Sequence, residues 1–387
     1  MTDSPIFNPM LDEDDDEQVV AGPRVVLPRS DANRPTPVHR EPRFGEKGFG
    51  KGKPHPHRGT PRARVTENDA PLLAYLNEVQ VATTVAASTV LRARESRVST
   101  GGRMLTPDGM HDKLKRLEKL GMVQATYSRD DRVSLLWGVT EAGIAAAQRF
   151  GYLLEDSQPN QYVLKDMKRR TQNHYRAIAQ VGANFIGGVY SKKLGIGPVT
   201  VDQLISEPRM RREQRPIQKM LEARDKDNPG FGTWRERTLN QAATEIGEGK
   251  LAVGDLLLKY PELRTIGRPN ADPTSPRFKD AHWPDLVIDL DKNRSSLRGK
   301  SLLIEVELSN KSWRELEMIL ATMAKEVARP VVYERVVYFT AQESIAKRIL
   351  QADKNAGLNL VESGKLLILP IEDRFGTPFK ILDTIAD

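Results

Sequence analysis

The segment 301–308 has the sequence Ser-Leu-Leu-Ile-Glu-Val-Glu-Leu, which is almost uniformly apolar except for Glu305 and Glu307. A short apolar run of this kind predicts a strand. Because Glu305 and Glu307 are two residues apart, a strand would project both from the same face. Acids among large apolar side chains are unfavourable unless they are paired. The segment therefore predicts either structural ion pairs, with Arg298, Lys300 or Arg335 as partners, or a functional site.

Helical and strand patterns alternate from residue 233 onward. Their order, α-β-β-β-α-β with one further α-β unit, predicts a mixed sheet flanked by helices. The expected helices are 234–246, 313–327 and 343–353, and the expected strands are 263–266, 286–290, 301–308, 335–340 and 365–370.

Asp285 begins the strand that precedes 301–308, directly after Pro284. If the two strands are antiparallel neighbours, Asp285 and Glu305 come close together at one end of the sheet. Two or three carboxylate oxygens there would suit Mg²⁺, which keeps several of its waters. A metal in that place could activate a water against a phosphodiester, and Lys311 could stabilise the charge that develops on phosphate.

The segment 70–149 has a different pattern, with two short helices, a third helix rich in lysine and arginine, and two apolar stretches on either side of a charged turn. Thr106 is the expected N-cap of the third helix and Gly121 its expected end. The two stretches, 122–127 and 133–139, predict a β-hairpin. This order of elements is that of a winged helix, and the amino-acid sequence of the segment resembles that of many bacterial winged-helix proteins.

In a winged helix the third helix enters the major groove of DNA and the hairpin tip lies over phosphates or the minor groove. A winged helix used for protein contacts is the alternative. The residues expected on DNA are Lys113, Lys115, Arg116, Lys119, Arg129 and Arg132.

Composition limits the function classes. The chain has 387 residues, a formal net charge of +7 and no cysteine, which excludes disulfides and cysteine-ligated metals. A basic balance favours a polyanionic partner, usually nucleic acid, although a solvated surface is the alternative. The absence of a long apolar run or a secretory signal predicts a soluble, cytoplasmic protein without membrane contact.

Four regions are expected along the chain. Residues 1–68 are acidic and then basic and proline-rich, and predict a disordered arm. Residues 69–152 predict the winged helix, 153–230 a helical connector, and 231–387 the mixed α/β domain. Within the connector, the small apolar stretch 177–187 predicts a closely packed helix, with a homodimer interface as one use.

The arrangement "PD … ExE … K" resembles the PD-(D/E)XK nuclease superfamily. This resemblance assigns Asp285 to the motif aspartate, Glu305 to the acid of the (D/E)XK element and Glu236 to an accessory glutamate on the first helix. Glu307 stands where the motif lysine belongs, and Lys311 is its expected substitute. The resemblance also implies Mg²⁺ as cofactor if the site is catalytic.

The stretch "PDLVIDL … GKSLLIEVELSNKS" also resembles the replication-relaxation family of plasmids and integrative elements. That resemblance implies a DNA-binding protein that acts in replication, transfer or maintenance of mobile DNA, with a replication or transfer protein as partner. Two other functions stay open. One is a Mg²⁺-dependent endonuclease or nickase that uses Asp285 and Glu305, and the other is a winged-helix repressor without catalysis.

Overall fold

A computed structural model describes residues 64–92, 103–129, 134–155, 157, 167–223, 231–267, 281–290, 300–329 and 331–380. All of these lie within one compact unit, Pro61–Asp387. Most of the expected arm, 1–68, therefore falls outside the described residues, and so does Arg132 of the expected hairpin tip. In the described ranges, no helix combines the length and the apolar character needed to cross a membrane.

The described residues form a mixed α+β fold, as expected, with eleven α-helices, a three-stranded sheet and a mixed five-stranded sheet. The N-terminal part begins with a 3₁₀ turn and ends with a helix that follows the second strand of a hairpin. Its elements are η1 (Glu67–Asp69), α1 (Ala70–Val79), β1 (Ala82–Thr83), α2 (Thr84–Val90), α3 (Pro107–Lys119), β2 (Val123–Tyr127), β3 (Leu135–Val139) and α4 (Glu141–Arg149).

Local chemistry explains where α3 and α4 begin and end. The Thr106 side chain accepts a hydrogen bond from Gly109 N at 3.2 Å, and Thr140 caps α4 in the same way. Gly121 has φ +72°, a conformation that favours glycine, and it lies just past the end of α3. The expected helices and the hairpin are confirmed. The short strand β1, which pairs with β3 to complete an antiparallel sheet, was not expected.

The middle of the chain contributes to both parts of the fold. Its elements are α5 (Arg169–Gly187), α6 (Ser191–Leu194), η3 (Val201–Gln203), β4 (Leu204–Ser206) and α7 (Glu207–Ala223). Residues 177–187 of α5 are buried within this chain, because α5 packs against α2 on one side and the five-stranded sheet on the other. The helix is closely packed as expected, but its small residues serve this internal packing and are not available for a dimer interface.

The C-terminal part carries most of the second sheet. Its helical elements are α8 (Phe231–Gly247), η4 (Val253–Asp255), α9 (Leu256–Lys259), η5 (Pro261–Arg264), α10 (Trp313–Ala328) and α11 (Glu343–Asn355). Its strands are β5 (Ile266–Gly267), β6 (Ala281–His282), β7 (Leu286–Ile288), β8 (Ser301–Glu307), β9 (Tyr333–Thr340) and β10 (Leu366–Pro370).

The sheet order is β10-β9-β8-β7-β4, in which β8, β9 and β10 are parallel and β7 is antiparallel to both of its neighbours. One expectation was wrong. Of the segment 263–266, residues 263 and 264 belong to the 3₁₀ turn η5, and only Ile266 lies in a strand, β5, which pairs with β6 in a separate two-stranded sheet. The strand that pairs with β7 on its outer side is β4, which comes from the middle of the chain.

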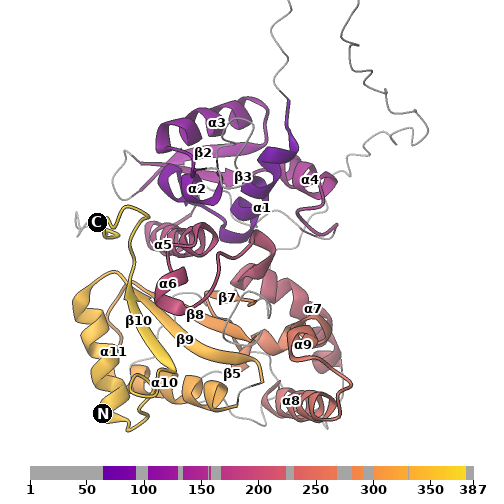
Figure 1. Cartoon of the computed structure of the whole chain (residues 1–387), viewed down its shortest axis with the longest axis vertical. Coiled ribbons are helices and arrows are strands. Elements are labelled where there is room, and N and C mark those ends of the chain that lie inside the picture. The colour runs from indigo at the N-terminus through magenta and orange to yellow at the C-terminus, as the bar shows by residue number, and fades with distance from the viewer. Residues whose placement is uncertain are drawn as a thin grey trace, which may run out of the picture. The chain divides into compact units, whose positions relative to one another are not determined.

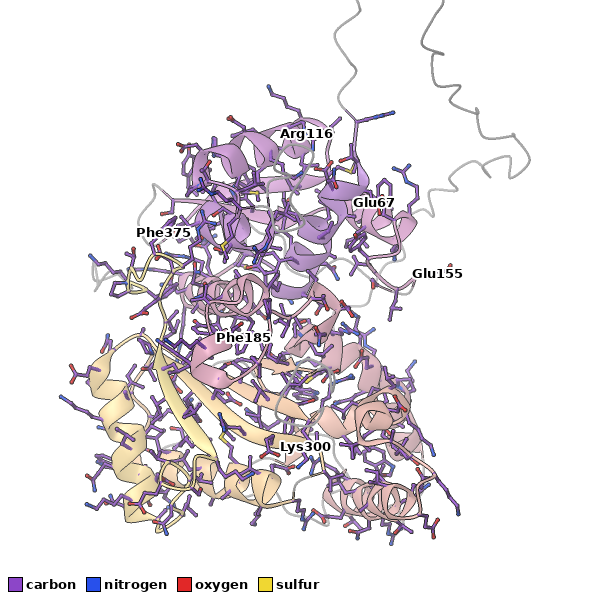
Figure 2. All side chains as sticks on the ribbon, in the orientation of Figure 1. Glu67, Arg116, Glu155, Phe185, Lys300 and Phe375 are labelled. Atoms are coloured by element: carbon purple, nitrogen blue, oxygen red, sulfur yellow. The ribbon has the colours of Figure 1, made fainter. Side chains whose placement is uncertain are left out.

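Helices cover both faces of the five-stranded sheet (Figure 1). On one face, Phe185 of α5 lies 6.0 Å from Phe339 of β9 between ring centroids, and Tyr190 lies 4.9 Å from the same ring (Figure 2). On the other face, α10 and α11 cover Leu303 and Tyr338. Burial on both faces explains why 301–308 is apolar at nearly every position.

Candidate functional site

Asp285 and Glu305 lie opposite one another at one end of the β7–β8 pair. Leu286 pairs with Ile304 in antiparallel register, and one step further the register places Asp285 across from Glu305. The Asp285 carboxylate reaches across to β8, where Oδ2 accepts a hydrogen bond of 2.7 Å from Val306 N. The expectation that antiparallel strands bring these two acids together is confirmed by this geometry.

The other oxygen of Asp285 meets a histidine from α5. His174 Nε2 lies 2.9 Å from Asp285 Oδ1. Burial by itself would raise the pKa of Asp285, but the charge and hydrogen bond of His174 outweigh it and bring the pKa below its ordinary value. Burial would lower the pKa of His174, and Asp285 reverses that, so the pKa of His174 is raised. The pair therefore favours an ionised aspartate beside a protonated imidazole.

Glu305 has a histidine partner of its own, from β6. His282 Nε2 lies 3.0 Å from Glu305 Oε1. Burial raises the pKa of Glu305, and the nearby charge of Asp285 adds to this, while His282 offsets only part of it. The two facing carboxylates thus have pKa values shifted in opposite directions, a pattern typical of sites where one acid stays ionised and the other exchanges a proton.

Glu307 lies on the same face of β8 as Glu305, as expected, and pairs with Lys311. Lys311 Nζ lies 3.0 Å from Glu307 Oε2 and 3.7 Å from Glu315 Oε1. Ser309 donates to Glu307 Oε1 from both its backbone N and its hydroxyl, each at 3.1 Å. Burial would lower the pKa of Lys311, but Glu307 outweighs that and raises it. The Lys311 ammonium therefore lies beside the Glu307 carboxylate.

A fourth carboxylate, Glu207 at the start of α7, is close enough for its charge to raise the pKa of both histidines. In this group, acids from α7, β8 and the residue before β7 lie close to cations from α5, β6 and the segment after β8. We call it the carboxylate cluster, and it consists of His174, Glu207, His282, Asp285, Glu305, Glu307 and Lys311.

The carboxylate cluster is partly open to solvent through its cations. The side chain of His282 is 34% exposed and that of Lys311 28%, whereas those of Asp285 and Glu305 are 11% and 12% exposed. Of the structural partners considered for the two glutamates, Lys300 pairs instead with Glu334 at 2.9 Å (Figure 2), and Arg298 lies outside the described residues. Carboxylates gathered this closely repel one another, so the arrangement is more typical of a functional site than of a stabilising one.

The donor chemistry of Asp285 and Glu305 fits a divalent cation, since both supply carboxylate oxygens from adjacent strands. Among the described residues, however, no three acidic or histidine side chains are arranged around a common point as a metal-ligand set. A cation would therefore have two carboxylates from the chain, with waters and substrate oxygens completing its shell. Mg²⁺ is commonly held in this way.

Glu236, expected as the accessory glutamate, is not brought to this group by any described contact. It lies on α8, where its carboxylate forms an ion pair with Arg329 and is about half exposed. The helix that does reach Asp285 is α5, and the side chain that it presents there is His174.

Two of the basic residues expected on DNA are bound to an acid of the same chain. Lys113 Nζ lies 2.5 Å and Arg116 Nη2 lies 2.6 Å from Asp69 Oδ1, and the Asp69 side chain is fully buried. Arg116 lies beside η1, the turn that carries Asp69 (Figure 2). The two cations share a helix face, as their spacing indicated, but this face points to η1.

The other expected contacts differ in their surroundings. Lys115 is 42% exposed and pairs with Glu118 at 2.9 Å, and its ammonium lies 5.3 Å from the centre of the Trp137 ring. Lys119 is exposed at the end of α3. Arg129 donates from its backbone N to Gln172 of α5 at 2.7 Å. The solvent side of α3 therefore presents Lys115 and Lys119 together with Asp108 and Asp112.

Sequence reasoning missed His174, His282 and Glu207. The partners of the two histidines are 111 and 23 residues away in the chain, so no local spacing connects them. One local signal existed for His282, which stands three residues before Asp285 in the same turn into β7. No residue near His174 in the sequence indicates a functional role for it, because its partner Asp285 is distant in the chain.

Comparison with protein-family models, with curated proteins and with solved structures finds no match to this chain.

Proposed function

We propose that the carboxylate cluster is the active centre of a metal-dependent phosphodiesterase that cleaves or nicks DNA. The observation that carries the proposal is the facing pair, Asp285 and Glu305, on adjacent antiparallel strands with Lys311 beside Glu307. Among the elements that form or cover the five-stranded sheet, the order α5-β4-β7-β8-α10-β9 supports it, because it resembles the α-β-β-β-α-β order of PD-(D/E)XK nucleases once the inserted elements α6, α7, α8, α9, β5 and β6 are set aside. Asp285 directly precedes the second of these strands and Glu305 lies on the third.

Three residues of the cluster have definite tasks in this proposal. Asp285 stays ionised, because His174 and Val306 N hold both of its oxygens. Glu305 faces Asp285 and would supply the second carboxylate to a divalent cation. A bound divalent cation would polarise the phosphate and activate the attacking water. Lys311 provides a positive charge for the phosphate oxygens as they gain charge.

The N-terminal elements support a docking role. Their order, α1-β1-α2-α3-β2-β3, is that of a winged helix, with α3 as the recognition helix and the β2–β3 hairpin as the wing. Because Lys113 and Arg116 are engaged by Asp69, we assign the contact with duplex DNA to Lys115, Lys119 and the hairpin. The resemblance of the sequence to the replication-relaxation family supports a role in the replication, transfer or maintenance of mobile DNA.

The test uses supercoiled plasmid with Mg²⁺ or Mn²⁺. We expect wild-type protein to nick or linearise the plasmid, and Asp285→Asn or Glu305→Gln to lower the rate about 100-fold or more. Glu236→Gln is the matched control, since it removes a carboxylate outside the cluster, and should keep full activity. Plasmid that stays intact with wild-type protein would overturn the nuclease proposal.

A second candidate is a DNA-binding protein or repressor whose cluster is purely structural. It is favoured by the fact that Asp285, Glu305 and Glu307 all have partners within the chain. In that case Asp285→Asn and Glu305→Gln change the stability of the protein and leave duplex binding intact, while no cleavage occurs with any variant.

A further inference from the structure

Trp313 is a large aromatic residue left in solvent beside the carboxylate cluster. It is the first residue of α10 and follows Lys311 by two positions. The residue is 42% exposed, in contrast to the fully buried Trp137. Burial of an indole is strongly favourable, so an exposed one at the edge of a candidate site indicates a binding surface.

Arg348 of α11 fixes this indole in place. Its guanidinium carbon lies 4.4 Å from the centre of the Trp313 ring, within the range of a cation–π contact. The same guanidinium donates from Nη2 to the backbone oxygen of Lys311 at 2.8 Å. One face of the ring is therefore covered by Arg348, and the exposed surface belongs to the remainder of the ring. Arg348 therefore contacts both the Trp313 ring and the backbone oxygen of Lys311.

The rim around Trp313 is polar. Ser309, Asn310 and Ser312, which connect β8 to α10, are all exposed. A single ring among hydroxyl and amide groups does not provide the continuous apolar surface that a protein interface uses. It fits a ligand that combines a flat aromatic group with polar oxygens, as a nucleotide does.

We propose that an unpaired base of a DNA strand stacks on the free face of Trp313 while the neighbouring phosphate lies at the carboxylate cluster. The proposal rests on the proposed function insofar as it takes a phosphodiester to be the ligand of the cluster. Stacking of this kind requires a base that is not in a duplex, because paired bases are covered by their neighbours. The cluster therefore acts on single-stranded or locally opened DNA, next to the duplex on which α3 docks.

The test measures binding of labelled oligonucleotides to the full chain by fluorescence anisotropy, without added divalent cation. One strand is a short single-stranded DNA of mixed sequence, and the other has the same length with abasic nucleotides. We expect Trp313→Ala to weaken binding of the base-bearing strand about tenfold, while Trp313→Tyr retains most of the affinity. On the abasic strand, Trp313→Ala should have no effect.

Tyr152→Ala is the matched control, because Tyr152 is an aromatic residue of nearly the same exposure, 41%. It should leave binding of both strands unchanged. Unchanged affinity of Trp313→Ala for the base-bearing strand, or an equal loss on both strands, would overturn the proposal. This experiment measures binding, whereas the plasmid experiment measures cleavage. The stacking proposal can therefore be refuted while the nuclease proposal stands, and the nuclease proposal can be refuted while the stacking proposal stands.

Discussion

At the residue scale, Asp69 is fully buried and accepts ion pairs from Lys113 and Arg116 of α3. It also accepts hydrogen bonds from the backbone N and the hydroxyl of Thr66 at 2.8 and 2.9 Å. Burial by itself would raise the pKa of Asp69, but the two cations and Thr66 outweigh it and lower the pKa to about 2. Two segments that lie far apart in the chain, residues 66–69 and helix α3, are thereby joined at the start of α1.

The pKa of Asp69 predicts an acid dependence of stability. A carboxyl whose folded pKa is depressed stabilises the fold above its unfolded pKa, near 3.8, and that stability is lost as the pH falls through about 2. We expect Asp69 to contribute about 2 kcal/mol to the free energy of unfolding at neutral pH. Urea unfolding at pH 7 and at pH 2.5 should give a smaller difference for Asp69→Asn than for wild type. An equal difference would contradict this prediction.

At the element scale, α5 approaches α2 so closely that a side chain would not fit between them. A Cβ added at Gly187, the last residue of α5, would lie 2.6 Å from Thr89 Cγ2 and 3.2 Å from Thr89 O. A Cβ added at Gly247, the last residue of α8, would meet nothing within 4 Å. The two glycines therefore occupy the same place in their helices and differ only in their neighbours.

This difference predicts opposite effects of the same substitution. Gly187→Ala should lower the free energy of unfolding by about 1–3 kcal/mol, because α2 must shift to make room. Gly247→Ala should leave it unchanged or raise it by up to about 1 kcal/mol, because alanine is the better helix former. Thermal unfolding followed by circular dichroism measures both, and a Gly187→Ala protein as stable as wild type would refute the close approach.

The solvent side of α3 gives a second prediction at this scale. Replacing both Lys115 and Lys119 by alanine should weaken binding to duplex DNA and reduce the slope of log K against log salt by about two. Lys347→Ala is the control, because Lys347 is an exposed lysine of α11 that also pairs with a glutamate. Lys113→Ala should instead lower stability through the loss of its pair with Asp69. Docking through α3 would be wrong if the double variant kept the wild-type slope.

Elements with strong local signals could be predicted from the sequence, and contacts between distant segments could not. The β8 strand, the α3 cap at Thr106 and the pairing of Asp285 with Glu305 follow from short-range patterns. The strand β4 has three residues and no alternation, so nothing local indicates that it joins the sheet. Two sets of contacts depend on tertiary packing alone. They are the ion pairs of Lys113 and Arg116 with Asp69, and the hydrogen bond between His174 and Asp285.

At the scale of the whole molecule, the N-terminal elements and one face of the five-stranded sheet share one core, and a second core lies on the other face of the sheet. A single cluster of buried side chains includes Leu76 of α1, Ile178 of α5 and Ile304 of β8. The expected division at residues 152 and 230 therefore separates segments that bury one another. Strand β4, which pairs with β7, lies before the second of these boundaries.

Two truncations should consequently behave differently. A fragment of residues 231–387 lacks both β4 and the α5 cover of the sheet, and we expect it to be unfolded or aggregated. Removal of residues 1–60, which lie outside the unit Pro61–Asp387, should leave the Tm unchanged. Circular dichroism and calorimetry of both proteins measure this, and a cooperatively folded 231–387 fragment would contradict the shared core.

Helix α5 also has a mechanical consequence. Three residues in the first two turns of α5 make contacts outside the helix. The Gln172 side chain accepts a hydrogen bond from the backbone N of Arg129, and Arg176 Nη1 lies 3.3 Å from the hydroxyl of Ser128. His174 is hydrogen-bonded to Asp285. The segment that directly follows β2 in the hairpin and the aspartate at the sheet edge are thus both hydrogen-bonded to the first two turns of α5. A displacement of the hairpin relative to the sheet should therefore be transmitted through α5 to Asp285.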